Sequence, residues 1–83
     1  MDPTEISTAV VTALQDIAPE VAQEDLAADS PLREQVDLDS MDWLNFLVRL
    51  HTRFGVDIPE ADYRRLVTLR DVTEYLATRM AGR

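Results

Sequence analysis

The sequence predicts a small all-α domain: a four-helix bundle with three longer helices, one short helix and a long loop after the first helix. Two observations favour this class. Apolar residues recur at spacings of three and four along most of the chain, and no segment shows the alternation typical of strands. With 83 residues the chain can form one hydrophobic core, so we expect a single domain spanning residues 1–83.

The first helix is predicted to begin at Pro3, because Asp2 can cap it and proline suits the first helical position. Its buried face follows from the spacing of the apolar positions, which are Ile6, Val10, either Ala13 or Leu14, and Ile17. Pro19 disfavours helical geometry in the residue before it, so the helix should end near Ala18.

Residues 19–39 lack this periodicity and form a connection of about 20 residues, which is long for a loop in a small domain. Isolated apolar residues occur along it: Val21, Leu26, Leu32, Val36 and Leu38. We therefore expect the connection to lie across the core, with room for a short helical turn.

The central helix is predicted from the Asp39-Ser40 pair to Phe54, with Gly55 supplying the left-handed residue that ends many helices. Its polar residues after Ser40 fall in one narrow stripe: Asp42, Asn45, Arg49, Thr52 and Arg53. Because nearly every other position is large and apolar, we expect this helix to be packed by neighbours on both sides.

Two further elements complete the bundle. Residues 56–59 read as a short extended piece, and Pro59 opens a brief helix that continues to Leu66. Thr68 and Asp71 have capping-box spacing and should start the last helix. Its inner face is Leu69, Val72, Tyr75, Leu76 and Met80.

Composition narrows the possible functions. Cysteine is absent, which excludes disulfides, thiolate metal sites and cysteine nucleophiles. The acidic start and the lack of a long apolar run argue against targeting signals and membrane insertion, so we expect a cytoplasmic protein, and we expect a monomer. Residues 1–40 hold ten acidic side chains and one basic side chain, which disfavours nucleic-acid binding and would attract a basic partner surface.

Enzyme and metal motifs do not fit. Asp37, Asp39 and Asp42 resemble the opening of a calcium loop, but the fifth, sixth and twelfth positions lack the required ligand, glycine and glutamate. His51 is the only histidine and has no partner cluster, and two glycines cannot form a phosphate loop. Since a core of this size supports little buried polar machinery, we expect a non-catalytic protein with no metal site.

After these exclusions, Ser40 is the remaining candidate for a functional residue, and it lies at the start of the most apolar helix. Taken alone, a serine in this place is most simply an N-cap.

The surroundings of Ser40 resemble the acyl carrier protein family. That family has an Asp-Ser-Leu triplet at the start of the second of four helices, followed at a fixed distance by a Phe-Gly-Val-acid-Ile-Pro segment. Asp39-Ser40-Met41 resembles the triplet with methionine in place of leucine, and its spacing to residues 54–59 fits the pattern without a gap. Thr68-Leu69, Tyr75 and Leu76 continue the match. The resemblance covers nearly the whole chain and implies a freestanding carrier with the four-helix fold of the family.

The resemblance implies that Ser40 carries a 4′-phosphopantetheine arm, transferred from coenzyme A by a separate phosphopantetheinyl transferase. The thiol of the arm would hold an acyl group as a thioester, which explains thiol chemistry in a protein without cysteine. Further implied partners are an acyl-loading ligase or acyltransferase, and acyl-transferring or condensing enzymes of fatty acid, polyketide or specialised lipid and secondary-metabolite biosynthesis.

The polar stripe of the central helix is the expected docking face for these partners, with five recognition residues: Asp39, Met41, Asp42, Asn45 and Arg49. The acids at its start match the family, whereas the neutral and basic residues farther along depart from it. This gradient suggests a dedicated partner with a complementary surface. Alternatively, the charges only complement the helix dipole.

The resemblance also implies a cavity for the acyl chain between the central and third helices. Its candidate lining is Trp43, Leu44, Leu47, Phe54, Ile58, Tyr63 and Leu66. Trp43 could instead be a core residue without contact to the arm.

Two alternative functions stay open. An aminoacyl or peptidyl carrier is disfavoured because Asp37 and Leu38 occupy positions where a paired glycine would have suggested it. In the other, the chain is a helical protein-interaction module in which Ser40 is only a cap.

Overall fold

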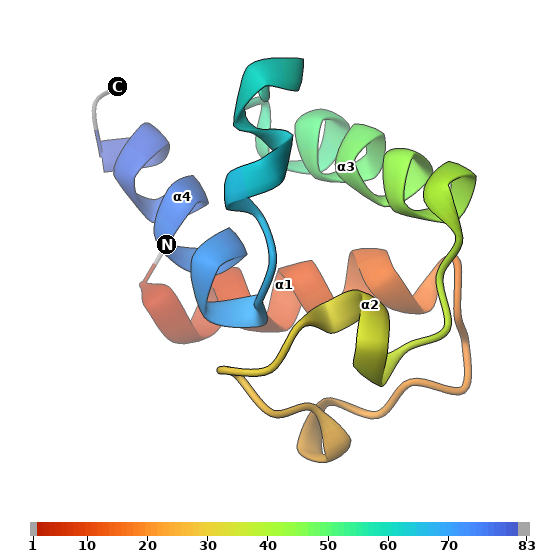
Figure 1. The fold of residues 1–83 in the computed structure, drawn as a ribbon. Helices are drawn as coiled ribbons and strands as arrows, with labels where there is room; N and C mark the ends of the chain where they lie inside the picture. Colours follow the sequence, from red (N-terminus) through yellow and green to blue (C-terminus); the bar gives the residue numbers. More distant parts are fainter. Residues whose placement is uncertain (1, 82–83) are drawn as a thin grey trace.

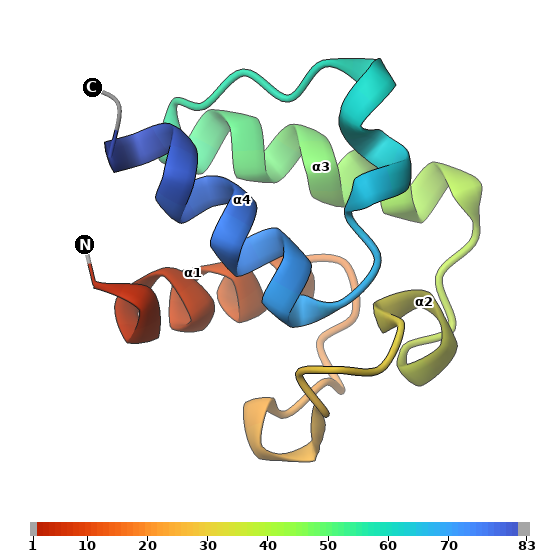
Figure 2. The same cartoon turned by 60° about the vertical axis from the view of Figure 1, so that its left-hand side comes forward.

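The computed structural model describes residues 2–81 and contains the predicted all-α bundle (Figure 1). Its longer helices are α1 (Pro3–Gln15), α3 (Ser40–Phe54) and α4 (Leu69–Ala81), and a short helix α2 (Leu32–Gln35) precedes α3. Two 3-10 segments, η1 (Gln23–Asp25) and η2 (Glu60–Arg65), lie in the connections. Helix α1 packs against both α3 and α4, and in both views η2 lies on the side of the bundle away from α1 (Figures 1 and 2).

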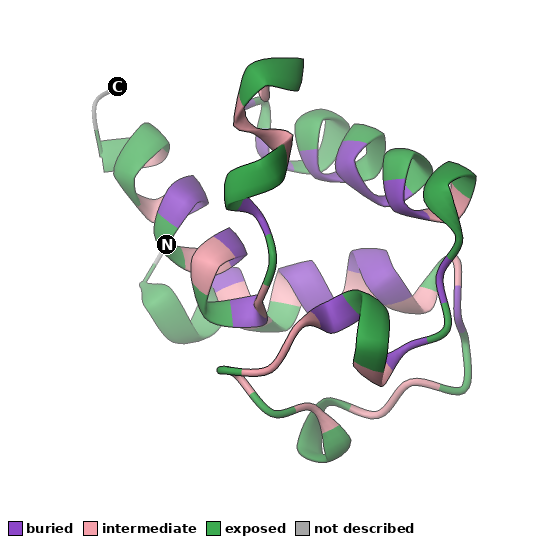
Figure 3. Cartoon of the chain, in the orientation of Figure 1, coloured by how far each residue is buried: buried purple, intermediate pink, exposed green. Residues whose placement is uncertain are grey.

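One apolar cluster fills the space between the helices, and the buried faces of all of them turn toward it (Figure 3). Its fully buried members come from α1, α2, α3 and α4: Ile6, Val10, Leu14, Leu32, Phe46, Leu47, Leu50, Val72 and Leu76. No polar or charged residue in the described part of the chain is buried. Removal of apolar surface from water therefore supplies most of the stability of the fold.

Helix α1 starts where the sequence predicted and ends earlier. The Asp2 side chain accepts a hydrogen bond of 2.8 Å from the backbone N–H of Glu5, which confirms it as the cap. The predicted end near Ala18 is wrong, because the α-helix stops at Gln15. A final turn continues to Ala18, whose N–H donates to the carbonyl of Leu14 at 2.9 Å, and Pro19 prevents a further turn.

The long connection lies across the core, as its apolar residues predicted. Leu32, Val36 and Leu38 are buried, and the short helical turns within it are η1 and α2. The Gln35 side chain holds the preceding loop through three hydrogen bonds of 2.7–2.9 Å to backbone groups of Ala27 and Ser30. These contacts explain how about 20 residues stay ordered without a long helix.

The prediction that α3 is packed on both sides is wrong. Three of its apolar residues are exposed, with exposed fractions of 74% for Met41, 47% for Leu44 and 52% for Val48. At 3.6 residues per turn these positions lie nearly opposite the buried Phe46 and Leu50. Only one face of α3 therefore meets the core, and the face that carries Met41 is open to solvent.

The segment after α3 is fixed by local contacts. Gly55 adopts φ 64°, the left-handed conformation that ends α3 as predicted. The His51 ring nitrogen Nδ1 lies 2.9 Å from the carbonyl oxygen of Val56, so this histidine has a structural contact.

The start of α4 is also as predicted, because Thr68 and Asp71 form a capping box with reciprocal hydrogen bonds of 3.0 and 3.1 Å.

Candidate functional site

Ser40 is the first residue of α3 and is exposed. The interpretation of Ser40 as the helix cap is wrong, because Asp39 has the extended backbone of a cap and accepts a hydrogen bond of 2.8 Å from the Asp42 N–H. Within residues 2–81, the Ser40 hydroxyl has no hydrogen-bond partner. Its oxygen is therefore free to react without loss of a contact that holds the helix.

The start of α3 also suits a phosphate ester. The Trp43 N–H donates to the Asp39 carbonyl at 3.0 Å and the Asp42 N–H to the Asp39 side chain, whereas the N–H groups of Ser40 and Met41 meet no acceptor in the described chain. Unpaired N–H groups and the positive end of the helix dipole both favour an anion there. A phosphodiester on the Ser40 oxygen would lie beside these groups.

The five predicted recognition residues are the cap Asp39 and four residues of α3. Asp39, Met41, Asn45 and Arg49 are exposed, and Asp42 is half-buried. Arg49 also forms an ion pair of 3.6 Å with Asp16, just beyond the end of α1. The predicted charge gradient is therefore present on the surface. Arg49, at its basic end, also pairs with Asp16 of the same chain.

Met41, one of these recognition residues, belongs to an exposed apolar row that also contains Leu44 and Val48 and that the sequence did not predict. Leu44 was expected in a cavity, and Val48 is one of the apolar positions outside the polar stripe, which were expected to be covered by neighbouring elements. Spacings of three and four were a usable signal, because they place these three residues together on one side of α3.

Five of the seven predicted cavity residues line two open grooves. The first, here called the Trp43 groove, has a volume of about 250 Å³ and includes Trp43, Tyr63 and Leu66. The second, here called the Leu47 groove, has a volume of about 280 Å³ and includes Leu47, Ile58 and Tyr63. The other two candidates line neither groove, because exposed Leu44 faces solvent and buried Phe54 packs in the core.

Trp43 has contacts on two sides. It is 8% exposed and its ring lies 5.2 Å from the ring of Phe46, so it belongs to the core, and its remaining surface lines the Trp43 groove. Trp43 is therefore a core residue that also has surface open to the Trp43 groove.

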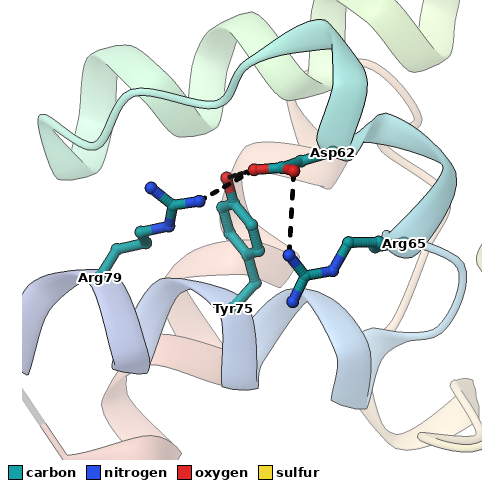
Figure 4. Close-up of polar contacts among 4 residues, drawn as sticks. All are labelled: Asp62, Arg65, Tyr75 and Arg79. Carbon is teal, nitrogen blue, oxygen red and sulfur yellow. Dashed lines mark hydrogen bonds and ion pairs between the residues drawn. The ribbon is translucent and has the colours of Figure 1, made fainter.

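A polar cluster that sequence reasoning missed joins η2 to α4 (Figure 4). The Tyr75 hydroxyl donates to Asp62 Oδ2 at 2.6 Å, Arg79 Nη2 contacts the same oxygen at 2.9 Å, and Arg65 lies 3.8 Å from Asp62 Oδ1. Both guanidinium groups also approach the Tyr75 ring, at 5.7 Å for Arg65 and 4.8 Å for Arg79. Burial, followed by the hydrogen bond and the charge of Asp62, raises the pKa of Tyr75. Asp62 and its partners on α4 are 13 and 17 residues apart, so no short-range pattern marked the contact.

Comparison with known proteins shows the family of this chain. The family model described as "Phosphopantetheine attachment site" matches residues 8–76. The chain is 30% identical to an acyl carrier protein of Campylobacter hominis over 56 residues, which cover 68% of this chain and 71% of that protein. It is 30% identical to one of Acidothermus cellulolyticus over 71 residues, 82% of this chain and 84% of that protein. An acyl carrier protein of Chlamydia trachomatis is 34% identical over 59 residues, 71% of this chain and 77% of the relative.

These matches define the chain as a phosphopantetheine attachment domain. It belongs to the acyl carrier protein family, whose members are non-catalytic carriers with phosphopantetheine as their cofactor. None of the helices in residues 2–81 has the length and apolarity needed to cross a membrane.

Proposed function

We propose that this chain is a single-domain acyl carrier in which the Ser40 oxygen bears the 4′-phosphopantetheine arm. The observation that carries the proposal is an exposed hydroxyl without a partner, next to unpaired N–H groups at the start of α3. In the loading step, the Ser40 oxygen attacks the β-phosphate of coenzyme A and a phosphodiester bond forms. The pyrophosphate bond breaks, adenosine 3′,5′-bisphosphate leaves, and the hydroxyl proton passes to a base of the transferase.

The test is the intact mass of the protein after incubation with coenzyme A, magnesium and a broad-specificity phosphopantetheinyl transferase. Wild type should gain one phosphopantetheine and Ser40→Ala none. Ser7→Ala is the matched control, because Ser7 lies within α1, and it should load like wild type. Loading of Ser40→Ala, or failure of wild type with a transferase that modifies another carrier, would refute the proposal.

The proposed docking face consists of the recognition residues Asp39, Met41, Asp42, Asn45 and Arg49, together with Leu44 and Val48, which complete the exposed apolar row with Met41. An apolar row flanked by charges is the usual composition of a binding surface, with the apolar part giving affinity and the charges giving orientation. The transferase, an acyl-loading ligase or acyltransferase, and downstream acyl-transferring or condensing enzymes would bind here in turn.

This face is tested by the rate of transferase loading. Met41→Ser should lower kcat/KM about tenfold, because Met41 is 74% exposed next to Ser40 and its removal costs contacts only in the complex. Val67→Ser removes an exposed apolar side chain outside α3 and should load normally. Equal rates for all three proteins would remove Met41 from the docking face.

The cargo is proposed to be an acyl group of fatty acid, polyketide or specialised lipid metabolism. The support is apolar surface within reach of Ser40, since the Trp43 groove begins one turn along α3. Matched acyl and aminoacyl thioesters on the holo-protein test this choice. Amide signals of Leu66 and Val67 should shift with the acyl form only, and equal shifts with both forms would favour the aminoacyl carrier.

A further inference from the structure

Two grooves on this molecule share a single side chain. Tyr63, on η2, is half-buried against the core and lines both the Trp43 groove and the Leu47 groove. Trp43 and Leu47 are four residues apart on one face of α3, about 6 Å along its axis. The grooves therefore follow one another along α3, and Tyr63 stands between them.

Ser40 determines which groove an attached chain meets first. Trp43 lies only three residues after Ser40, about 4.5 Å along the helix axis, whereas the Leu47 groove begins one turn farther on. The apolar residues of the Trp43 groove include Trp43, Leu66 and Val67, and charged side chains of Arg33, Glu34 and Arg64 also line it. Such a groove suits a short acyl chain that comes from the direction of Ser40.

We propose that Tyr63 is a specificity-determining residue that closes the far end of the Trp43 groove and so limits the acyl chain that this carrier shelters. The proposal rests on the proposed attachment of the arm at Ser40. The cargo class is an acyl chain short enough to fit the groove of roughly 250 Å³. Methylene groups beyond Tyr63 remain in water and gain no burial.

The hydrogen bonds of the neighbouring residue Asp62 hold Tyr63 in place at the far end of the Trp43 groove. Asp62 joins η2 to α4 through Tyr75 at 2.6 Å and Arg79 at 2.9 Å (Figure 4). Tyr63 is the next residue of η2. Asp62 is thus a positioning residue for Tyr63. Displacement of Tyr63 by a longer chain would have to strain these bonds as well as expose the ring.

The experiment uses the full chain loaded with butyryl, hexanoyl, octanoyl, decanoyl or dodecanoyl phosphopantetheine. For each cargo, amide chemical shifts are recorded for Leu66 in the Trp43 groove and for Ile58 in the Leu47 groove, and Tm is compared with that of the holo-protein. In wild type, we expect the Leu66 signal to move, the Ile58 signal to stay, and the gain in Tm to level off at a short member of the series.

Tyr63→Ala should join the two grooves. We expect the Ile58 signal to move with the longer cargoes and the Tm plateau to shift at least one member up the series. Tyr63→Phe is the matched control, because it keeps the ring and the Tyr63 hydroxyl has no hydrogen-bond partner within residues 2–81. It should reproduce the wild-type profile.

The outcomes separate this inference from the proposed function. If no arm is gained at Ser40, the proposed function fails. If the arm is gained and Tyr63→Ala keeps the wild-type plateau, the role of Tyr63 is refuted while attachment stands. If Tyr63→Ala does not fold, the wild-type protein alone decides. Equal movement of the Leu66 and Ile58 signals then refutes the proposal that Tyr63 closes the Trp43 groove, and movement of the Leu66 signal alone supports it.

Discussion

The start of α3 and the junction between η2 and α4 use polar side chains in opposite ways. At the start of α3, the Ser40 hydroxyl has no partner among residues 2–81 and Met41 is 74% exposed. At the junction, the Asp62 side chain is 18% exposed and accepts contacts from three other side chains. One region leaves its groups free for other molecules, and the other uses them to hold the fold.

The difference shows how a chain this small can separate function from stability. A reactive hydroxyl that also capped α3 would be lost to the helix on modification, whereas Asp39 performs the capping and leaves Ser40 available. Substitutions at the junction should therefore change stability, and substitutions around Ser40 should change loading and docking.

The largest expected effect is on stability, from Asp62→Ala. This change leaves the Tyr75 hydroxyl and the Arg79 guanidinium without their acceptor, and should lower the free energy of unfolding by about 2 kcal/mol. For a chain of this size the loss lowers Tm by about 10 °C. Thermal unfolding of the unloaded proteins measures it.

Glu60→Ala is the control for this prediction, since Glu60 is exposed on the same η2 segment. It should unfold close to wild type, and both variants should still load at Ser40 at low temperature. If Asp62→Ala and Glu60→Ala lowered the free energy of unfolding equally, the contacts of Asp62 would not be what stabilises the junction between η2 and α4.

Asp39→Ala should have the next largest effect, a loss of about 1 kcal/mol, because it removes the side chain that accepts the Asp42 N–H at 2.8 Å. Ser40→Ala should cost less than Asp39→Ala, since alanine is a good helix former at the first helical position. Urea unfolding of both variants, with exposed Asp37→Ala as control, tests the division of roles. A larger loss for Ser40→Ala would reverse it.

Sequence patterns predicted the caps of α1 and α4 for a physical reason, although the cap of α3 is Asp39 and not Ser40. A cap is a hydrogen bond between residues three apart, as in Asp2 with Glu5 or Thr68 with Asp71. Such a contact can therefore be predicted from a short stretch of sequence. The exposed face of α3 was mispredicted because apolar character does not specify which neighbours arrive. Val48 is exposed since helix packing covers only the opposite side of α3.

The candidate site divides in the same way. The place of Ser40 at the start of a helix followed from local spacing. The two grooves, the role of Tyr63 between them and the contact of Asp62 with α4 depend on how η2 packs, which involves residues far apart in the sequence. Such contacts require the folded structure.

Tyr75 adds a pH dependence that belongs to the junction alone. Its pKa is raised above the ordinary value of 10.0, first by burial and then by Asp62, so the folded protein holds the phenolic proton more tightly than the unfolded chain. The resulting stability is fully present below about pH 10 and is lost as the pH rises through the raised pKa. Unfolding free energies of wild type and Tyr75→Phe, measured on both sides of pH 10, should converge at the higher pH. A constant difference between them would contradict this.

The smallest effect on stability is expected from Arg49→Ala, although Arg49 forms an ion pair. Its guanidinium lies 3.6 Å from Asp16, both side chains are about half exposed (51% and 52%), and pairs of this kind contribute about 0.5 kcal/mol or less. Asp16→Ala breaks the same pair from the other side and serves as the matched control. If Arg49 contacts partner enzymes, Arg49→Ala should slow transferase loading and Asp16→Ala should not, since only the first removes charge from the docking face. Equal slowing by both variants would place Arg49 with Asp62 among the residues that hold the fold.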